Sequence, residues 1–366
     1  MLSTSEIRNQ IKNILDNHNL PKYDIFVSSC NEATSVLETE DSSYRALDAV
    51  GGAGGLLDFT SPKYNGIPVV VMPDLHARGY FVLDLLDFIV PDCGKSVLQL
   101  LCEKRLIVCC VGDIFHAEAR ARDRWKLAYE DFCAYYYDGE DSSRFSESRA
   151  MQDEMRENLS LLEILFLLKK SFPEHFHVLK GNHENIKNAT YEPGENLDFG
   201  NRGFRKFCEE GIMCSEFVRI FYDEVVLHCI SGFEMSLPLC AVFKNCVVSH
   251  AEPSRVFTRE EIVNGRASDD VVFGLTWTAN DAVSANTVDG TMKNLYKCGL
   301  FSVLSNPLKN SVWIAGHRPV PDVYLTRQNG RFIQIHNPEM EYVSLVRFGK
   351  KFNPDSDIYD VCPKKV

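Results

Sequence analysis

Five short apolar runs of the 366-residue sequence are each followed by Asp, Asn or His. The five endings read, in order, Pro73-Asp74-Leu75-His76, Gly112-Asp113, Gly181-Asn182-His183-Glu184, Ser249-His250 and Gly316-His317. A single Asp-x-His pair is ordinarily part of a loop, but four of the chain's ten histidines occupy these endings. Carboxylate, amide and imidazole groups together form a mixed oxygen and nitrogen ligand set, which suits Mn, Fe or Zn. The pattern therefore predicts a metal centre.

The apolar runs themselves predict the strands that must position these groups. They are rich in Val and Ile, and segments with helical spacing of apolar residues follow them, which is typical of an α/β protein. The predicted strands span 68–72, 106–111, 177–179, 246–248 and 312–315, with closing strands at 332–335 and 342–346. Ligands of α/β sheets bind at the carboxyl ends of strands, where residues distant in sequence meet. A helix-rich stretch over 117–172 is long for a crossover and predicts an insertion near the site.

Taken together, the motifs resemble the calcineurin-like metallophosphoesterase superfamily. Two further segments, Leu237-Pro238-Leu239 and Leu275-Thr276-Trp277, are similar to its PPP-type serine/threonine protein phosphatase branch. The resemblance covers about residues 64–348. It implies an α/β fold, namely a four-layer sandwich of two mixed β-sheets flanked by helices.

The resemblance also implies a site with two divalent metal ions, Mn in first place with Fe or Zn as alternatives. The implied ligands are Asp74, His76 and Asp113 for the first ion, and a bridging Asp113 with Asn182, His250 and His317 for the second. Metal-bound hydroxide would attack the phosphorus of a phosphate ester directly. His183 would act as the general acid or as a phosphate contact.

The sequence departs from the family pattern just after Gly112-Asp113. The family has Asp and then Arg where this chain has His116 and Ala117. A carboxylate beside His183 would favour its imidazolium form, whereas a second imidazole would not. His116 is therefore a second catalytic candidate, and Glu118 is the alternative orienting group.

The missing phosphate-binding arginine leaves three candidates for substrate binding, Arg78, Arg120 and Arg122. Four other positions differ from the family, which has glycines where this chain has Pro73, Ala77, Ala251 and Glu252. Glu252 adds negative charge near an anionic substrate, so the substrate preference of the PPP branch cannot simply be copied.

These features predict a metallophosphoesterase that hydrolyses a phosphomonoester, as a protein serine/threonine phosphatase does. The expected partner is a phosphorylated protein or a small phosphate-ester substrate. A dinucleoside polyphosphate or cyclic-nucleotide hydrolase is the alternative within the enzyme class, since the same metals cleave anhydrides and diesters. An alternative of another class is a metal-binding regulatory protein with little activity.

Composition limits the partners and the compartment. The chain has 39 basic and 51 acidic residues, a net charge of −12, which disfavours nucleic acid and anionic membranes as partners. Its thirteen cysteines are scattered through apolar runs, so we expect reduced packing residues in a cytoplasmic protein. We expect an N-terminal extension over 1–60, a catalytic domain over 61–350 with the helical insertion at 117–172, and a tail over 351–366.

Several features have a structural interpretation instead. The glycine cluster at 51–55 lacks the Lys-Ser/Thr of a phosphate-binding loop and predicts a flexible turn. The histidines outside the motifs are interpreted as surface or core residues: His18, His175, His177, His228 and His336.

Overall fold

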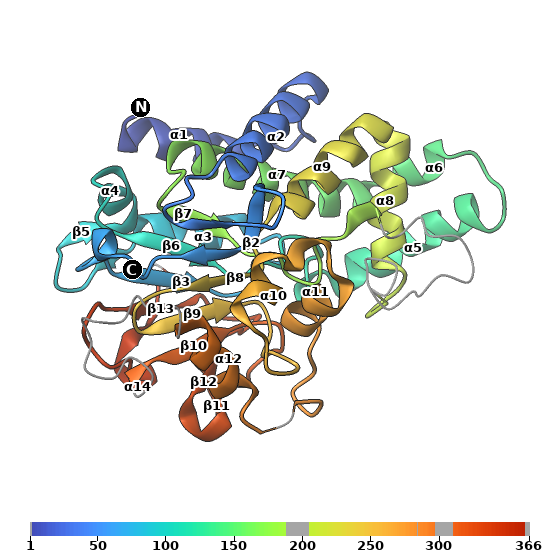
Figure 1. Cartoon of the computed structure of the whole chain (residues 1–366). Helices are drawn as coiled ribbons and strands as arrows, with labels where there is room; N and C mark the ends of the chain where they lie inside the picture. The colour runs from blue at the N-terminus through green and yellow to red at the C-terminus, as the bar shows by residue number, and fades with distance from the viewer. Residues whose placement is uncertain (1, 188–204, 284, 297–309, 363–366) are drawn as a thin grey trace.

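Two β-sheets packed face to face form the centre of the molecule in the computed structural model, which describes residues 2–187, 205–283, 285–296 and 310–362 (Figure 1). The five-stranded sheet has the order β14 (Ile358–Asp360), β13 (Tyr342–Val346), β3 (Val69–Met72), β6 (Ile107–Cys110) and β7 (Phe176–Val178). The seven-stranded sheet has the order β1 (Arg45–Leu47), β2 (Ala53–Asp58), β8 (Cys240–Val242), β9 (Cys246–Ser249), β10 (Val312–Ala315), β12 (Phe332–Gln334) and β11 (Leu325–Arg327). A separate hairpin joins β4 (Ile89–Val90) to β5 (Lys95–Ser96).

Both sheets are mixed, and the strands that precede the predicted ligands are parallel neighbours. β3 pairs with β6 and β6 with β7, with Val70 opposite Val108. In the other sheet β9 pairs with β10 and β10 with β12. Parallel neighbours end at the same sheet edge, so the loops that follow them emerge side by side.

The alternation of apolar side chains along the strands explains the layers. Val69 and Val71 of β3 face the cluster between the sheets, whereas Val70 and Met72 face the helices. In β9, Val248 faces the same inter-sheet cluster, and Val247 faces the helices on the opposite side. A strand buried on both faces reads as a nearly continuous apolar run, which is why β3 contains only Val and Met and β9 has only Ser249 as a polar residue.

Helices cover both outer faces, so the molecule has four layers (Figure 1). The cluster on the outer face of the five-stranded sheet includes residues from α1 (Thr4–Leu15), α2 (Tyr23–Glu38), α3 (Gly79–Asp87), α4 (Val97–Cys102), α5 (Arg122–Tyr136), α6 (Ser143–Ser146), α7 (Arg149–Ser171), α8 (Glu210–Phe221) and α9 (Glu224–Ser236). The seven-stranded sheet packs against α10 (Arg259–Val263), α11 (Asp269–Thr276) and α12 (Thr287–Tyr296), while α14 (Pro354–Asp357) precedes β14. The predicted fold class is confirmed. In the described residues, none of the helices has the length and apolar character needed to cross a membrane.

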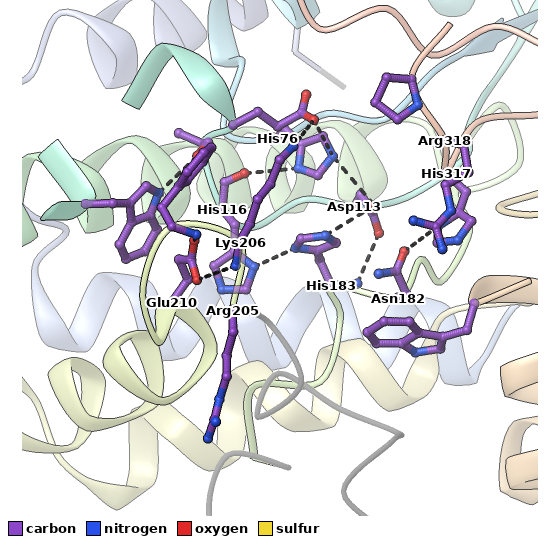
Figure 2. Close-up of a pocket in the computed structure, with 16 residues that line it drawn as sticks. His76, Asp113, His116, Asn182, His183, Arg205, Lys206, Glu210, His317 and Arg318 are labelled. Atoms are coloured by element: carbon purple, nitrogen blue, oxygen red, sulfur yellow. Dashed lines mark hydrogen bonds and ion pairs between the residues drawn. The ribbon is translucent and has the colours of Figure 1, made fainter. Parts of the chain in front are cut away.

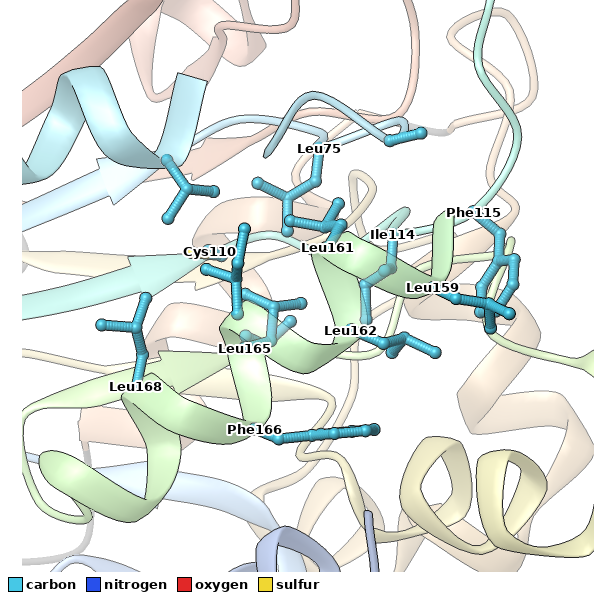
Figure 3. Close-up of a cluster of buried hydrophobic side chains, with 14 of the residues drawn as sticks. Leu75, Cys110, Ile114, Phe115, Leu159, Leu161, Leu162, Leu165, Phe166 and Leu168 are labelled. Carbon is cyan, nitrogen blue, oxygen red and sulfur yellow. The ribbon is translucent and has the colours of Figure 1, made fainter. Parts of the chain in front are cut away.

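The helix α7 supports the loops that carry the predicted ligands. Figure 3 shows Leu161, Leu162 and Leu165 of α7 beneath Leu75 and Ile114, which belong to the loops after β3 and β6. Each fully buried Leu contributes roughly 1.5–3 kcal/mol to folding. The predicted helix-rich stretch over 117–172 thus supplies part of the core under the site.

The N-terminal 60 residues join the same core. Ile7 and Ile11 of α1 and Phe26 of α2 are fully buried in the cluster over the five-stranded sheet, and β1 and β2 belong to the seven-stranded sheet. The predicted flexible turn at 51–55 is wrong for its second half, because β2 begins at Ala53. The backbone carbonyls of neighbouring segments lie so close to Gly54 that a Cβ there would stand 2.5 Å from Ala46 O, so glycine is required by packing.

Candidate active site

The predicted ligands meet at one end of the sandwich, where the two sheets face each other. Asp74, Asp113 and Asn182 follow β3, β6 and β7 of the five-stranded sheet, and all three are buried. His250 and His317 follow β9 and β10 of the seven-stranded sheet. The site therefore takes ligands from both layers, and a cavity of about 390 Å³ opens over it (Figure 2).

Four side chains converge as a compact donor set, and they are the ones predicted for the second metal. His250 Nε2 lies 2.7 Å from Asn182 Oδ1, 3.2 Å from His317 Nδ1 and 3.3 Å from Asp113 Oδ1. His317 Nδ1 lies 2.9 Å from Asn182 Oδ1. His250 Nδ1 is 3.0 Å from the Val111 carbonyl, to which it donates, and this tautomer directs the Nε2 lone pair at its neighbours.

This set fits a metal ion, because lone pairs that face one another require a positive charge between them. The same need is visible in the electrostatics. Burial opposes charge on His250, yet the carboxylates of Asp113 and Asp74 raise its pKa to about 9. A mixed set of imidazole, amide and carboxylate donors suits Mn, Fe or Zn.

His76 supplies a donor nitrogen outside this four-residue set. Its Nδ1 lies 3.0 Å from the His116 carbonyl and 3.2 Å from the Phe115 carbonyl, so the ring donates from Nδ1 and presents Nε2. His76 Nε2 is 3.6 Å from Asp113 Oδ2. Asp113 thus lies between His76 and His250, as a bridging ligand would.

Asp74 is the residue that the resemblance pairs with His76 at the first metal ion, and its carboxylate lies next to His317 and His250. Both of its carboxylate oxygens lie 3.0 Å from the His317 backbone N–H, and Oδ1 lies 3.3 Å from His250 Nδ1. In the part of the chain that the structure describes, donor atoms within 4.8 Å of one another form three groups, none of which includes Asp74: His76, Asp113 and His183; His76, Glu118 and His336; and Asp113, His250 and His317.

The loops that carry the ligands adopt left-handed backbone conformations. His76, Ala77, Asp113, His116 and His317 have φ between 43° and 68°. For residues other than glycine, this region costs about 1–3 kcal/mol each, and such strain gathers at functional sites. Ala77, which stands where the family pattern has glycine, adopts a left-handed conformation that glycine would adopt without this strain.

The carboxylate of Glu184 holds two of these loops together. It accepts hydrogen bonds from the backbone N–H groups of Asp113 (2.9 Å), Ile114 (2.6 Å) and Gly181 (2.6 Å). A Cβ on Gly181 would stand 2.2 Å from Asp113 Oδ1, so only glycine allows this approach. Burial, and then the nearby Asp113 carboxylate, raise the pKa of Glu184 to about 7.

The two catalytic candidates form a histidine pair. Figure 2 shows His183 between His116 and Asp113; the two Nδ1 atoms of the pair are 2.6 Å apart, and His183 Nε2 is 3.7 Å from Asp113 Oδ2. Burial and the neighbouring imidazoles lower the pKa of both rings, that of His116 to about 3. Both shifts favour the neutral form of the imidazoles. Glu118 does not orient His183 in this arrangement, since its carboxylate faces His76 and His336.

The three predicted substrate arginines lie outside the lining of the main cavity. The Arg78 guanidinium donates to the carbonyls of Leu75, Asp74, Asn337 and Met340, which binds two loops together. Arg120 pairs with Glu157 and donates to the His76 carbonyl at 3.1 Å. Arg122 lies over the Phe207 ring. Their role in substrate binding stays a prediction that no contact here supports.

Sequence reasoning missed several residues around the cavity. Its lining includes Arg205, Lys206 and Arg318, as well as Trp277 of the Leu275-Thr276-Trp277 segment. Arg318 directly follows the predicted ligand His317, and this adjacency could have identified it.

His336 is the principal omission. The interpretation as a surface or core histidine is incomplete, because His336 is fully buried inside the site, 2.9 Å from Asp74 Oδ2 and 3.2 Å from Glu118 Oε2. Burial opposes its charge, but these two carboxylates raise the pKa of His336 to about 9. The rule that predicted the other candidate ligands applies here too, since His336 follows the strand predicted at 332–335. By contrast, His18 and His228 are exposed, and His175 and His177 are buried outside the site, as interpreted.

Neither a family model nor a curated protein matches this sequence. Among solved structures, the chain is similar to a protein serine/threonine phosphatase from Saccharomyces cerevisiae with similarity to human phosphatase PP5. The TM-score is 0.57 at 14% identity, over 98% of this chain and 94% of that chain. A cold-active protein-tyrosine phosphatase from a Shewanella species overlaps at a TM-score of 0.37, with 14% identity over 80% of this chain and 76% of that one, and this likeness is too weak to support an argument. The chain therefore shares its fold with this serine/threonine phosphatase, and the four-layer arrangement is the one that its motifs predicted.

Proposed function

We propose that this protein is a metal-dependent phosphohydrolase, a metallophosphoesterase that hydrolyses phosphomonoesters in the manner of a protein serine/threonine phosphatase. The observation that carries the proposal is the convergence of four donor side chains, from both sheets, on the point faced by His250 Nε2. The similarity of fold to a yeast serine/threonine phosphatase supports it independently.

Two divalent cations would polarise a water molecule and neutralise charge on the phosphoryl oxygens. We propose Mn, with Fe or Zn as alternatives, because the donors are nitrogen and oxygen without thiolate. Asp113 is the residue that would bridge the two, since one carboxylate oxygen faces His76 and the other faces His250.

His183 would deliver the proton to the leaving oxygen. Its Nδ1 is engaged by His116, which fixes the plane of the ring and leaves Nε2 as the nitrogen that can face a substrate. Because its pKa is lowered, the protonated form is a strong acid but is scarce at neutral pH. We therefore expect activated leaving groups, which need little protonation, to react fastest at neutral pH.

Cationic side chains around the cavity suit a phosphate dianion. Arg318 is exposed beside His317, and Arg205 and Lys206 belong to the same lining. A volume of about 390 Å³ accommodates one phosphorylated side chain, so a phosphoprotein is the substrate class that we favour. The cysteines of the described residues are free, which suits the reducing cytoplasm that we propose as the location.

The test compares Asp113→Asn and His250→Ala with wild-type protein on p-nitrophenyl phosphate, a phosphoserine peptide, a dinucleoside polyphosphate and a cyclic nucleotide. We expect each substitution to lower kcat by at least about 10³-fold, because the set that stabilises the transition state is broken. Asp123→Asn on the exposed face of α5 is the matched control and should keep full activity. Full turnover by either site variant would overturn the proposal, and turnover of only the diester or anhydride would replace the substrate class.

A further inference from the structure

The geometry points to Glu118 and His336 as further ligands of the metal ion that His76 holds. Neither residue belongs to the ligand set that the family resemblance implies. The inference concerns metal binding alone, so it stands apart from whether the site hydrolyses phosphate esters.

The three side chains form a donor set of two imidazoles and one carboxylate. One ligand atom from each of His76, Glu118 and His336 lies within 4.8 Å of the other two. His336 Nε2 is 3.2 Å from Glu118 Oε2, and His76 Nε2 is 3.9 Å from Glu118 Oε1. Two histidines with one carboxylate are a donor combination that Mn, Fe and Zn accept.

The surroundings of His336 are those of a ligand rather than of a packed histidine. The ring is fully buried, and its nitrogens lie 2.9 Å from Asp74 Oδ2 and 3.2 Å from Glu118 Oε2. Even so, neither nitrogen makes a hydrogen bond of normal geometry with any described residue. The short distances therefore do not come from aligned N–H donors.

Short distances between donor atoms without an aligned N–H group are what two ligands of the same metal ion produce. Donor atoms that are each about 2.1 Å from an ion and about 90° apart lie about 3 Å from each other, well off the line of either lone pair. The contact between His336 Nε2 and Glu118 Oε2, at 3.2 Å, has this length. A bound cation would give the buried His336 Nε2 a partner along its lone pair.

The remaining requirements of a metal site are also met. His76 is fixed by its Nδ1 contacts with two backbone carbonyls, so Nε2 needs no rearrangement to bind. Arg120 donates to the His76 carbonyl and braces the same loop. A second cavity of about 680 Å³, lined by His76, Glu118 and Asn337, gives access from solvent on that side.

The experiment measures metal binding by the full chain without substrate. Wild-type protein, His336→Ala and Glu118→Gln are stripped with a chelator and titrated with Mn²⁺ by calorimetry, and bound metal is counted by elemental analysis. We expect each variant to lose one equivalent, or to bind it at least about 10-fold more weakly, while the other equivalent is unchanged. The absorption spectrum of the Co²⁺ form should change in the same variants, because the ligand field changes.

Two matched variants keep the result interpretable. His175→Ala removes a buried histidine that lies outside the site, beside the Leu106 carbonyl, and should bind metal as wild-type protein does. His250→Ala should lose the other equivalent, which separates this inference from the proposed function. If His336→Ala does not fold by circular dichroism, Glu118→Gln decides, since its side chain is partly accessible at the cavity. Wild-type stoichiometry and affinity in the folded variants would overturn the inference.

Discussion

The pairing of two imidazoles sets the chemistry of this site at the scale of single residues. His116 Nδ1 and His183 Nδ1 lie 2.6 Å apart, so one of these nitrogens donates to the other, and neither ring carries a negative charge that would stabilise an additional proton. Burial, His116 and the neighbouring histidines hold the pKa of His183 well below its usual range. A group with a lowered pKa loses its proton early as the pH rises, so the acid form of His183 belongs to low pH.

The substitution His116→Asp should keep the acid form of His183 populated at higher pH. A carboxylate next to His183 stabilises the imidazolium and raises its pKa, so the basic limb of the kcat profile moves to higher pH for substrates with poor leaving groups. His116→Asn, which keeps the size without the charge, should leave the limb where it is. An identical limb in all three proteins would mean that another group donates the proton.

At the scale of elements, α7 holds the His116 loop from below. Asn158 Oδ1 accepts the His116 backbone N–H at 2.8 Å, and Glu154 Oε1 accepts that of Ala117 at 2.8 Å. Asn158 in turn donates to Glu154 Oε1 at 2.9 Å. The left-handed conformation of His116 is thus maintained by a helix whose other face is core.

Asn158→Ala should remove the hydrogen bond by which α7 supports the His116 loop. The buried N–H of His116 would lose its acceptor, which costs about 1–3 kcal/mol of unfolding free energy, and misalignment of the histidine pair should lower kcat more than it changes KM. Denaturant unfolding and steady-state kinetics measure both effects. Gln152→Ala on the same helix serves as control, and a destabilised variant with unchanged kcat would show that the loop is held by other contacts.

Glu163 of α7 makes stability depend on pH. Burial raises its pKa to about 7, above the unfolded value of 4.5, so the folded protein retains a proton that the unfolded chain has released between these two values. The contribution of Glu163 to the free energy of unfolding should therefore fall as the pH rises from 4.5 to 7, by roughly 1–3 kcal/mol. Glu163→Gln should flatten that slope in denaturant titrations, whereas Glu130→Gln, on the exposed face of α5, should not.

At the scale of the whole molecule, a buried ion network fastens the N-terminal segment to the centre. Glu40 lies at 0% side-chain exposure between Arg45, at 2.8 Å, and Lys169 of α7. Burial opposes its charge, yet Lys169, His177 and Arg45 hold the pKa of Glu40 below its usual range. Three segments of the sequence therefore depend on one carboxylate.

Glu40→Gln should be strongly destabilising. It leaves two buried cations without their partner, and removing one member of a buried pair costs about 3–5 kcal/mol. Glu32→Gln, which breaks the pair with Lys170 at a 58% exposed carboxylate, should cost under about 1 kcal/mol. Thermal unfolding of the two variants separates these values, and equal losses would contradict the structural importance of the network.

Much of this architecture could be predicted from the sequence because of two simple regularities. Doubly buried strands read as apolar runs, and the polar residues that follow them, among them Asp74, Asp113 and His317, meet at one end of the sandwich as predicted. His336 obeys the same rule but was overlooked, since the family pattern has no ligand there. Two features depend on contacts between distant segments, which no local pattern encodes. They are the hydrogen bonds from Arg78 to four backbone carbonyls and the strand at 53–58.

The location of the site across the two sheets has a mechanical consequence. An ion held by Asp113 and His250 would be an interlayer cross-link between two sheets whose facing strands pack mainly through apolar side chains. Its binding free energy would then add to the cohesion of the sandwich by mass action. Chelation should accelerate amide hydrogen exchange in β9 and β10 more than in α7, because the layers are released where they were joined. Loss of the ions would thus loosen the scaffold along with silencing the chemistry.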